Sequence, residues 1–363
     1  MSPADHPVRV AVVGAGAFGR NHLRVLHELP QAALVAAVEP DSERAATVAQ
    51  QYGIPVFASV DAALAADLAL AAAVVAVPTV HHCAVASRLL RAGIDCLVEK
   101  PLAASLAEAD DLCTLAARHD RILQPGHLER FNPAVLAMLQ DLRGPMFFEA
   151  HRLSLFTPRS LDVDVVLDLM IHDLDVVLCF AASPVREVRA VGLPILSGKV
   201  DIANVRVEFD SGCVANFTAS RVSTERVRKL RYFEPGRYVS IDYARRDALV
   251  IAVDPSFHLE AAMRAGAAQD FVNGLPGLHF DKPAIVPGEP LRLELESFLS
   301  SVRTRSAPAV NASEGCRALA LALTIQDEMA RHALRTGLAG QGKIPSPVPN
   351  GGNQDAAVPG ACS

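Results

Sequence analysis

The sequence lacks the features that mark several common protein classes. It has no basic excess, since 34 Lys and Arg stand against 40 Asp and Glu for a formal net charge of -6 at pH 7, whereas nucleic-acid binders usually carry one. Its most apolar stretch, residues 64–77, contains Asp67 and ends at Pro78, so it is too short to span a bilayer. Residues 1–9 contain no apolar signal-peptide segment. We therefore expect a cytoplasmic protein that binds neither nucleic acid nor membrane.

Cysteine is present, but not in an arrangement that builds a cross-linked or metal-bound framework. The seven cysteines are widely spaced, and none of them forms a C-x-x-C pair. Disulfide frameworks and zinc sites need such spacings, so we expect reduced thiols and no bound metal. The composition, 51% hydrophobic and 20% charged over 363 residues, suffices for two packed domains.

The first third of the chain alternates short apolar runs with helical patterns, which is typical of βαβ units around a parallel sheet. The runs are continuously apolar, as expected of strands covered on both faces. Strands are expected at residues 9–13, 34–38, 74–77, 96–98 and 121–123, with helices at 19–29, 42–52, 80–92 and 106–118. The pattern predicts an α/β fold, with a doubly wound Rossmann domain over residues 1–124.

Beyond residue 125 the periodicity changes. A long helical pattern over residues 162–181 precedes six β-like segments separated by turn signals. We expect a C-terminal α+β domain over residues 125–336, with a large, mostly antiparallel open sheet that binds substrate and forms oligomers. The expected strands are 185–193, 202–209, 214–219, 227–232, 238–242 and 248–253, and helices over 291–304 and 314–334 close the fold. Residues 337–363, rich in Gly, Pro, Asn and Ser, are predicted to be a disordered tail.

Four apolar residues of this second part are expected on the outer face of its sheet: Val205, Val207, Val214 and Phe217. Open apolar faces usually pack on another layer. We therefore expect a homodimer or homotetramer formed sheet to sheet.

A glycine-rich motif follows the first expected strand. The segment Val10–Gly19 runs from an apolar strand into G-x-G-x-x-G and then a helix. The three glycines would serve a tight turn, close approach of the backbone to a pyrophosphate and close packing of the helix on the strand. The pyrophosphate would lie at the helix N-terminus, where unpaired N–H groups favour negative charge. The residues expected to form this cofactor site are Gly14, Gly16, Ala17, Phe18 and Gly19.

An acidic residue, Glu39, ends the second expected strand. A carboxylate there can accept hydrogen bonds from the adenosine ribose, and it repels a 2′-phosphate. The sequence therefore predicts NAD rather than NADP, a preference that the nearby Arg44 slightly weakens. The alternative is a glycine-rich turn followed by an unrelated surface glutamate.

Two later strand ends carry polar residues at the edge where a doubly wound sheet opens onto its ligand crevice. Lys100 lies where its cation can meet both cofactor and substrate, and Pro101 restricts its backbone to an extended conformation. A solvated surface lysine and a histidine that only packs or caps remain alternatives. The residues expected to border the cofactor here are Pro78, Thr79, His82, Glu99 and Lys100.

The helix over residues 162–181 is apolar on nearly every side and should be largely buried. Asp168, His172 and Asp175 are spaced to share one of its faces. Buried carboxylates and imidazoles must be paired or functional, and an Asp that orients a His is the arrangement of a general base. The alternative is a structural helix whose polar face binds a neighbouring strand.

In this order, the motifs resemble the Gfo/Idh/MocA family of oxidoreductases over roughly residues 8–335. The resemblance implies NAD-dependent hydride transfer from a sugar-type substrate, with His172 as base, Asp168 as its orienting partner and Lys100 polarising the carbonyl oxygen. Glu39 is a departure, since many members have Asp there. The motifs are Gly14-x-Gly16-x-x-Gly19, Pro78-Thr79-x-x-His82, Glu99-Lys100-Pro101, Asp168-x-x-x-His172 and Glu296-Ser297-Phe298.

Within the family, residues 126–134 and 168–173 resemble bacterial UDP-N-acetylglucosamine 3-dehydrogenases, whose 3-keto product passes to an aminotransferase in lipid A biosynthesis. Such a nucleotide sugar needs cations for its pyrophosphate. Two alternatives stay open: a dehydrogenase of another sugar, polyol or UDP-sugar uronate, and a catalytically silent cofactor-binding regulator. The arginine candidates are Arg130, Arg152, Arg159 and Arg221, and His127, Glu129 and Asp175 are further candidates for substrate contacts, although residues 126–133 alternatively make only interdomain hydrogen bonds.

Overall fold

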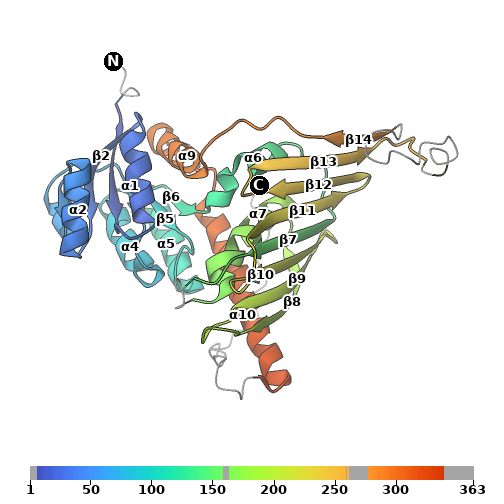
Figure 1. Ribbon diagram of the computed structural model, residues 1–363. Helices are drawn as coiled ribbons and strands as arrows, with labels where there is room; N and C mark the ends of the chain where they lie inside the picture. The colour runs from blue at the N-terminus through green and yellow to red at the C-terminus, as the bar shows by residue number, and fades with distance from the viewer. Residues whose placement is uncertain (1–5, 158–162, 259, 261–276, 339–363) are drawn as a thin grey trace.

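Two sheets organise the chain, one parallel and one mostly antiparallel (Figure 1). The computed structural model describes residues 6–157, 163–258, 260 and 277–338. In the first sheet the strand order is β3-β2-β1-β4-β5-β6, and every pair is parallel. This is the expected doubly wound arrangement. The strands are β1 (Val8–Val13), β2 (Ala32–Val38), β3 (Val56–Phe57), β4 (Ala72–Val75), β5 (Asp95–Glu99) and β6 (Leu123–Gly126).

Helices cover both faces of this sheet, which explains why its central strands are apolar throughout. Side chains of β1 and β4 pack into one core with α1 and into another with α4 and α5. The sequence pattern predicts α2 and α5 with the bounds observed, but it does not predict the short β3 and α3. The helices are α1 (Gly19–Glu28), α2 (Ser42–Tyr52), α3 (Val60–Ala65), α4 (His82–Arg91, preceded by a 3-10 turn, Thr79–His81) and α5 (Leu106–Arg118).

The second sheet has the order β14-β13-β12-β11-β7-β10-β9-β8. Among the strand pairs described in this second sheet, only β7–β10 is parallel, and the others are antiparallel. The sequence pattern does not predict β14 or the central strand β7. The strands are β7 (Phe147–Leu153), β8 (Val185–Leu193), β9 (Ile202–Phe209), β10 (Val214–Ser220), β11 (Val227–Glu234), β12 (Arg237–Asp242), β13 (Asp247–Val253) and β14 (Leu278–Asp281).

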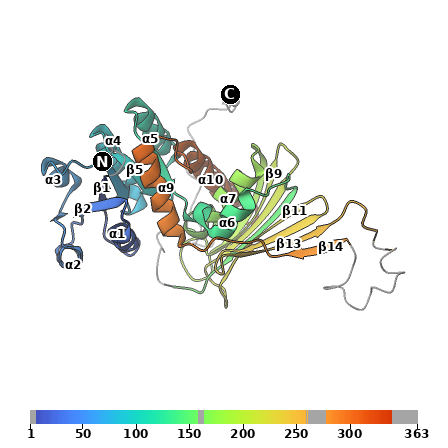
Figure 2. The ribbon, with the colours of Figure 1, turned by 90° about the horizontal axis from the view of Figure 1, so that it is seen from above.

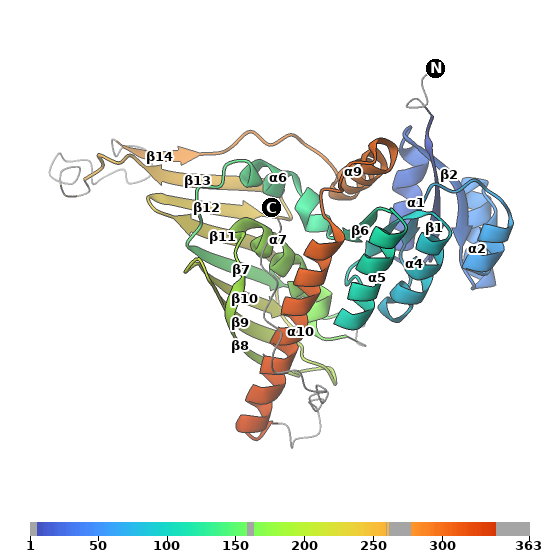
Figure 3. The same cartoon turned by 180° about the vertical axis from the view of Figure 1, so that it is seen from behind.

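One face of this sheet is covered by helices and the other is open, as Figures 2 and 3 show. The covering helices are α6 (Pro133–Leu139), α7 (Ile171–Ala181) and α10 (Ala312–Arg335). The start of the helix expected over residues 162–181 lies partly outside the described residues, and a π-helical turn, Val166–Met170, precedes α7. Every apolar residue of α7 except Cys179 and Ala181 is buried, as its all-round apolar pattern predicts.

The expectation that Val205, Val207 and Phe217 face outward is wrong. All three are buried in the core between the sheet and its helices, with exposed fractions of 0%, 0% and 1%. Successive side chains of a strand point to opposite faces of the sheet. A set of alternating apolar residues therefore does not by itself say which face the helices cover. The open face carries the alternate residues of β9, including Asn204 and Arg206.

The two C-terminal helices connect the sheets. Helix α9 (Pro290–Thr304) packs with α1 and β1, so that Leu295 and Phe298 lie in a core of the first sheet. Helix α10 contacts α5 and β6 as well as α7 and β8. The domain boundary expected at residue 124 divides the chain by sequence alone. In space, the C-terminal helices α9 and α10 pack back against the first domain. In the part of the chain that the structure describes, no helix is long and apolar enough to cross a membrane.

Candidate active site

The glycine-rich loop connects β1 to α1 at the carboxyl edge of the parallel sheet. Gly14 has φ +94°, and a Cβ there would lie 2.7 Å from the Ala76 carbonyl oxygen. A Cβ at Gly19 would overlap the carbonyl of Gly14, whereas one at Gly16 would meet nothing within 4 Å. Two glycines are thus needed for the turn and for helix packing, and the third leaves open space in front of the α1 N-terminus. These residues fit a dinucleotide pyrophosphate.

Glu39 lies beside this loop, just after β2. Its Oε2 accepts a hydrogen bond from the Ala15 amide at 2.8 Å, and its Oε1 accepts from the Asp41 amide at 3.0 Å and from Arg44 Nη2 at 2.9 Å. Burial raises the pKa of the Glu39 carboxyl, but these hydrogen bonds outweigh it and leave the pKa below its ordinary value. Glu39 is therefore a held carboxylate. The ion pair with Arg44 is a feature that the sequence did not predict.

Lys100 follows β5 and reaches the helical segment of the second domain. Its Nζ donates a hydrogen bond to the Asp168 carbonyl oxygen at 2.6 Å and lies 3.9 Å from Asp168 Oδ1. Burial lowers the pKa of Lys100, and the charges of Asp168 and Glu99 only partly oppose that shift. The structure thus brings together two of the three expected catalytic residues across the seam between the domains.

His172 lies on the first turn of α7, half-buried, and its Nδ1 has no hydrogen-bond partner among the described residues. Burial and the positive charges of Lys100 and Arg152 hold the pKa of His172 well below its ordinary value. The imidazole is therefore neutral near pH 7 and able to accept a proton.

The expected pairing of Asp168 with His172 does not form among the described residues. Asp168 lies on the π-helical turn and contacts Lys100 instead. π turns inside helices occur frequently at functional sites. The geometry assigns Asp168 to the lysine, because the wider turn presents the Asp168 carbonyl to Lys100 Nζ.

Arg152, an expected pyrophosphate ligand, is paired with two carboxylates of the protein. Its guanidinium donates to both carboxylate oxygens of Asp173, at 2.7 and 3.0 Å, and to Glu129 at 3.0 Å. It also lies over the ring of Tyr243, 5.1 Å from the centroid. Burial opposes the charged form, but Asp173 and Glu129 outweigh it and raise the pKa of Arg152. The Arg152 charge also acts on the expected base, because it contributes to the lowered pKa of His172.

The other arginine candidates are likewise paired or lie outside the described residues. Arg130 donates to Glu314 at 3.1 Å and lies 3.5 Å from Asp175. Arg221 donates to the Val163 carbonyl at 2.6 Å and lies 3.7 Å from Asp201. Arg159 lies outside the described residues.

Of the remaining expected residues, His82, Glu99 and His127 are buried. Both ring nitrogens of His82 lie 2.9 Å from backbone carbonyls, those of Pro101 and Val77. Glu99 pairs with His22 at 2.6 Å, a contact that the sequence did not predict. His127 is buried, and neither of its nitrogens has a partner among the described residues. Ala17, Phe18 and Pro78 are exposed beside the glycine-rich loop, and Thr79 is half-buried.

One cation that the sequence did not single out faces the site. Arg228, on β11, lies opposite Arg152 in the sheet register, and its charge contributes to the lowered pKa of His172. Its only signal in the sequence is its place in an alternating strand, and its position depends on pairing with the unexpected β7.

Known proteins share both parts of the chain. Residues 8–127 match the family model described as "Oxidoreductase family, NAD-binding Rossmann fold", and residues 143–234 match the "GFO/IDH/MocA C-terminal domain". The chain is 35% identical over 320 residues to UDP-N-acetylglucosamine 3-dehydrogenase of Acidithiobacillus ferrooxidans, which covers 88% of this chain and 96% of that protein.

The fold shows the same similarity. A solved structure of that dehydrogenase superposes with a TM-score of 0.78 at 34% identity, covering 87% of this chain and 96% of the other. An inositol 2-dehydrogenase of Leifsonia xyli is 35% identical over 189 residues, which cover 50% of this chain and 56% of that protein.

Proposed function

Because this chain belongs to the Gfo/Idh/MocA family of oxidoreductases and is an NAD-dependent dehydrogenase of CH–OH groups, we propose that it oxidises the C3 hydroxyl of UDP-N-acetylglucosamine to the 3-keto sugar. The substrate assignment rests on the 35% identity over 320 residues to a dehydrogenase of that name. At the site itself, the observation that carries the proposal is the contact between Lys100 and Asp168, together with the effect of the Lys100 charge on the pKa of His172.

Each of these side chains has a task in the proposed reaction. NAD, when bound, supplies the hydride acceptor. His172 is held neutral, so its imidazole can take the proton of the sugar hydroxyl. Lys100 keeps its ammonium directed by the Asp168 carbonyl, and it donates a hydrogen bond to the substrate oxygen as negative charge develops there. Asp168 acts as a positioning residue for Lys100.

The cofactor end fits NAD with the residues described above. The open space at Gly16 and the α1 N-terminus would hold the pyrophosphate, and Glu39 would accept the ribose hydroxyls. The carboxylate also disfavours a 2′-phosphate.

The chemistry of the product suggests its fate. Oxidation of an alcohol by NAD has an unfavourable equilibrium, so the ketone would build up only when a second enzyme removes it. We propose that an aminotransferase converts it to a diamino sugar for lipid A in the cytoplasm, where the thiols stay reduced.

Assembly is part of the proposal. The open face of the large sheet carries a cluster of aromatic rings. The ring centroid of Phe233 lies 5.5 Å from that of Phe147 and 5.2 Å from that of Tyr238. Covering such a face with a second copy would bury these rings, so we propose a homodimer or homotetramer formed through this sheet.

A second candidate substrate is a free polyol or another sugar. The similarity of half of the chain to an inositol 2-dehydrogenase favours it. A catalytically silent regulator is disfavoured, because such a protein has no need of a neutral His172 beside a directed Lys100.

The test is NADH formation with UDP-N-acetylglucosamine, an aminotransferase and glutamate, with the product identified by mass spectrometry. We expect reduced cofactor and an amino sugar. Turnover on inositol or a free sugar, with none on UDP-N-acetylglucosamine, would transfer the assignment to the second candidate.

A further inference from the structure

Four described arginines are candidate ligands for the phosphates of the substrate, and three of them are already neutralised. Arg152 is held by Asp173 and Glu129, Arg130 by Glu314 and Asp175, and Arg221 lies beside Asp201. The fourth, Arg228, forms no hydrogen bond or ion pair with any residue that the structure describes. Its charge is therefore available to a ligand.

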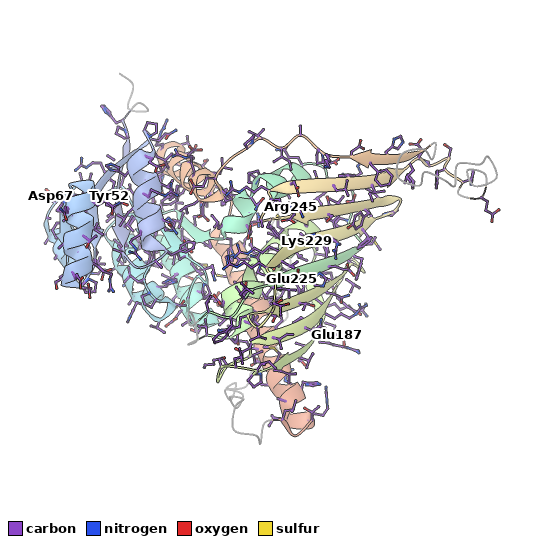
Figure 4. The ribbon with its side chains drawn as sticks, viewed as in Figure 1. Tyr52, Asp67, Glu187, Glu225, Lys229 and Arg245 are labelled. Carbon is purple, nitrogen blue, oxygen red and sulfur yellow. The ribbon has the colours of Figure 1, made fainter. Side chains whose placement is uncertain are left out.

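Strand alternation explains where this side chain lies. Arg228, Leu230, Tyr232 and Glu234 share the helix-covered face of β11, and the last three are buried. Arg228 alone is exposed there, so it lies where the cover of helices ends. Glu225 and Lys229, labelled in Figure 4, lie at the end of the sheet nearer the first domain, so this end of β11 is the one that faces the first domain.

The register and the electrostatics bring Arg228 next to the catalytic side chains. It lies opposite Arg152 on the neighbouring β7, and residues opposite each other in a sheet point to the same face. Partial burial and the positive charges of Arg152 and Arg226 lower the pKa of Arg228, and the carboxylates of Glu129 and Asp173 only partly oppose that shift. A cation destabilised by its neighbours gains from any bound anion.

We propose that Arg228 binds the diphosphate of the nucleotide-sugar substrate and so selects nucleotide sugars over free sugars; this rests on the function proposed above. The planar guanidinium can donate two parallel hydrogen bonds to phosphate oxygens, which Lys cannot match. Arg226, exposed two residues earlier in the chain, adds a second positive charge near Arg228.

The test measures the binding of UDP, which needs no turnover, by titration calorimetry in the presence of NAD. Replacing Arg228→Met removes the charge and keeps the apolar stem, and we expect the Kd for UDP to rise by about 10- to 100-fold. Arg228→Lys should give a smaller loss. The matched control is Arg143→Met. Arg143 is exposed, pairs with Asp141 and precedes the N-terminal end of β7, whereas Arg152 lies near the C-terminal end. This variant should bind UDP as the unchanged protein does.

Kinetics separate this role from a structural one. With UDP-N-acetylglucosamine, Arg228→Met should raise KM by a similar factor and leave kcat and the affinity for NAD nearly unchanged. If the unchanged protein binds UDP and oxidises UDP-N-acetylglucosamine, but Arg228→Met binds UDP within twofold of it, this inference is wrong and the proposed function stands. If the unchanged protein neither binds UDP nor oxidises UDP-N-acetylglucosamine, both are wrong.

Discussion

Replacement of Glu39 by Ala should convert an NAD-selective site into one that accepts NADP. The carboxylate makes hydrogen bonds with the Ala15 and Asp41 amides and with Arg44 Nη2, at 2.8, 3.0 and 2.9 Å. Removing it deletes the acceptor for the ribose and releases Arg44, whose side chain is 53% exposed. An unpaired arginine in this position can pair with a 2′-phosphate.

The magnitude follows from the lost hydrogen bonds. A hydrogen bond to a charged group contributes about 1.5–3 kcal/mol, which corresponds to roughly 10- to 100-fold in affinity. We expect Glu39→Ala to weaken NAD by that factor and to lower the preference for NAD over NADP by at least as much. Glu39→Gln, which keeps an acceptor for the Ala15 amide, should lose less NAD affinity.

Titration calorimetry with NAD and NADP measures this without any assumption about the substrate. The double variant Glu39→Ala/Arg44→Ala should lose the gain in NADP affinity, because the released cation is gone. Asp61→Ala is the control, since it removes one negative charge from an exposed pair with Arg88 in the same domain. Equal weakening of NAD and NADP in Glu39→Ala, or equal affinity for both in the unchanged protein, would refute the reasoning.

Three further predictions concern chemistry, pH and assembly. His172→Ala and Lys100→Ala should each lower kcat by roughly a hundredfold or more, the usual scale for a lost base or oxyanion donor; unchanged turnover in steady-state assays would remove that residue from the mechanism. The profile of kcat/KM against pH should fall on the acid side with a midpoint below 6.5, because a lowered pKa keeps His172 neutral to lower pH, and on the alkaline side below 10.5, because the pKa of Lys100 is also lowered. Asp168→Asn should move only the alkaline midpoint, and to lower pH, since the Asp168 charge raises the pKa of Lys100. A shift of the acid midpoint instead would indicate that Asp168 acts on His172. Light scattering at micromolar concentration should report a dimer or tetramer, which Phe147→Glu or Phe233→Glu on the open face should dissociate; a monomeric mass for the unchanged protein would contradict the sheet-to-sheet assembly.

Much of the first domain could be predicted because its signals are local. The turn at Gly14, the open position at Gly16 and the helix packing at Gly19 all lie within one short segment, and the structure gives each glycine the role that its spacing indicates. Helices α2 and α5 have the bounds that the helical pattern of the sequence predicts.

The central strand of the second sheet was missed for an identifiable reason. β7 buries Arg152 among apolar residues, and that arginine is tolerated there only because Asp173 and Glu129 neutralise it. The sequence of β7 therefore lacks the regular alternation of apolar and polar residues that marks a half-buried strand. The partners come from other elements, so the sequence of the strand alone does not reveal the pattern.

The sequence by itself determined most of the helices and strands and the glycine-rich cofactor motif, because each of these depends on neighbours in the chain. Only the tertiary structure decided that Val205 and Phe217 face inward, that Asp168 contacts Lys100, and that Arg228, unlike Arg130, Arg152 and Arg221, has no ion-pair partner among the described residues. These outcomes depend on which strands pair and which face the helices cover. Ion pairing and burial are set by residues brought together from distant parts of the chain, whereas turns, caps and periodicity are set by residues next to one another.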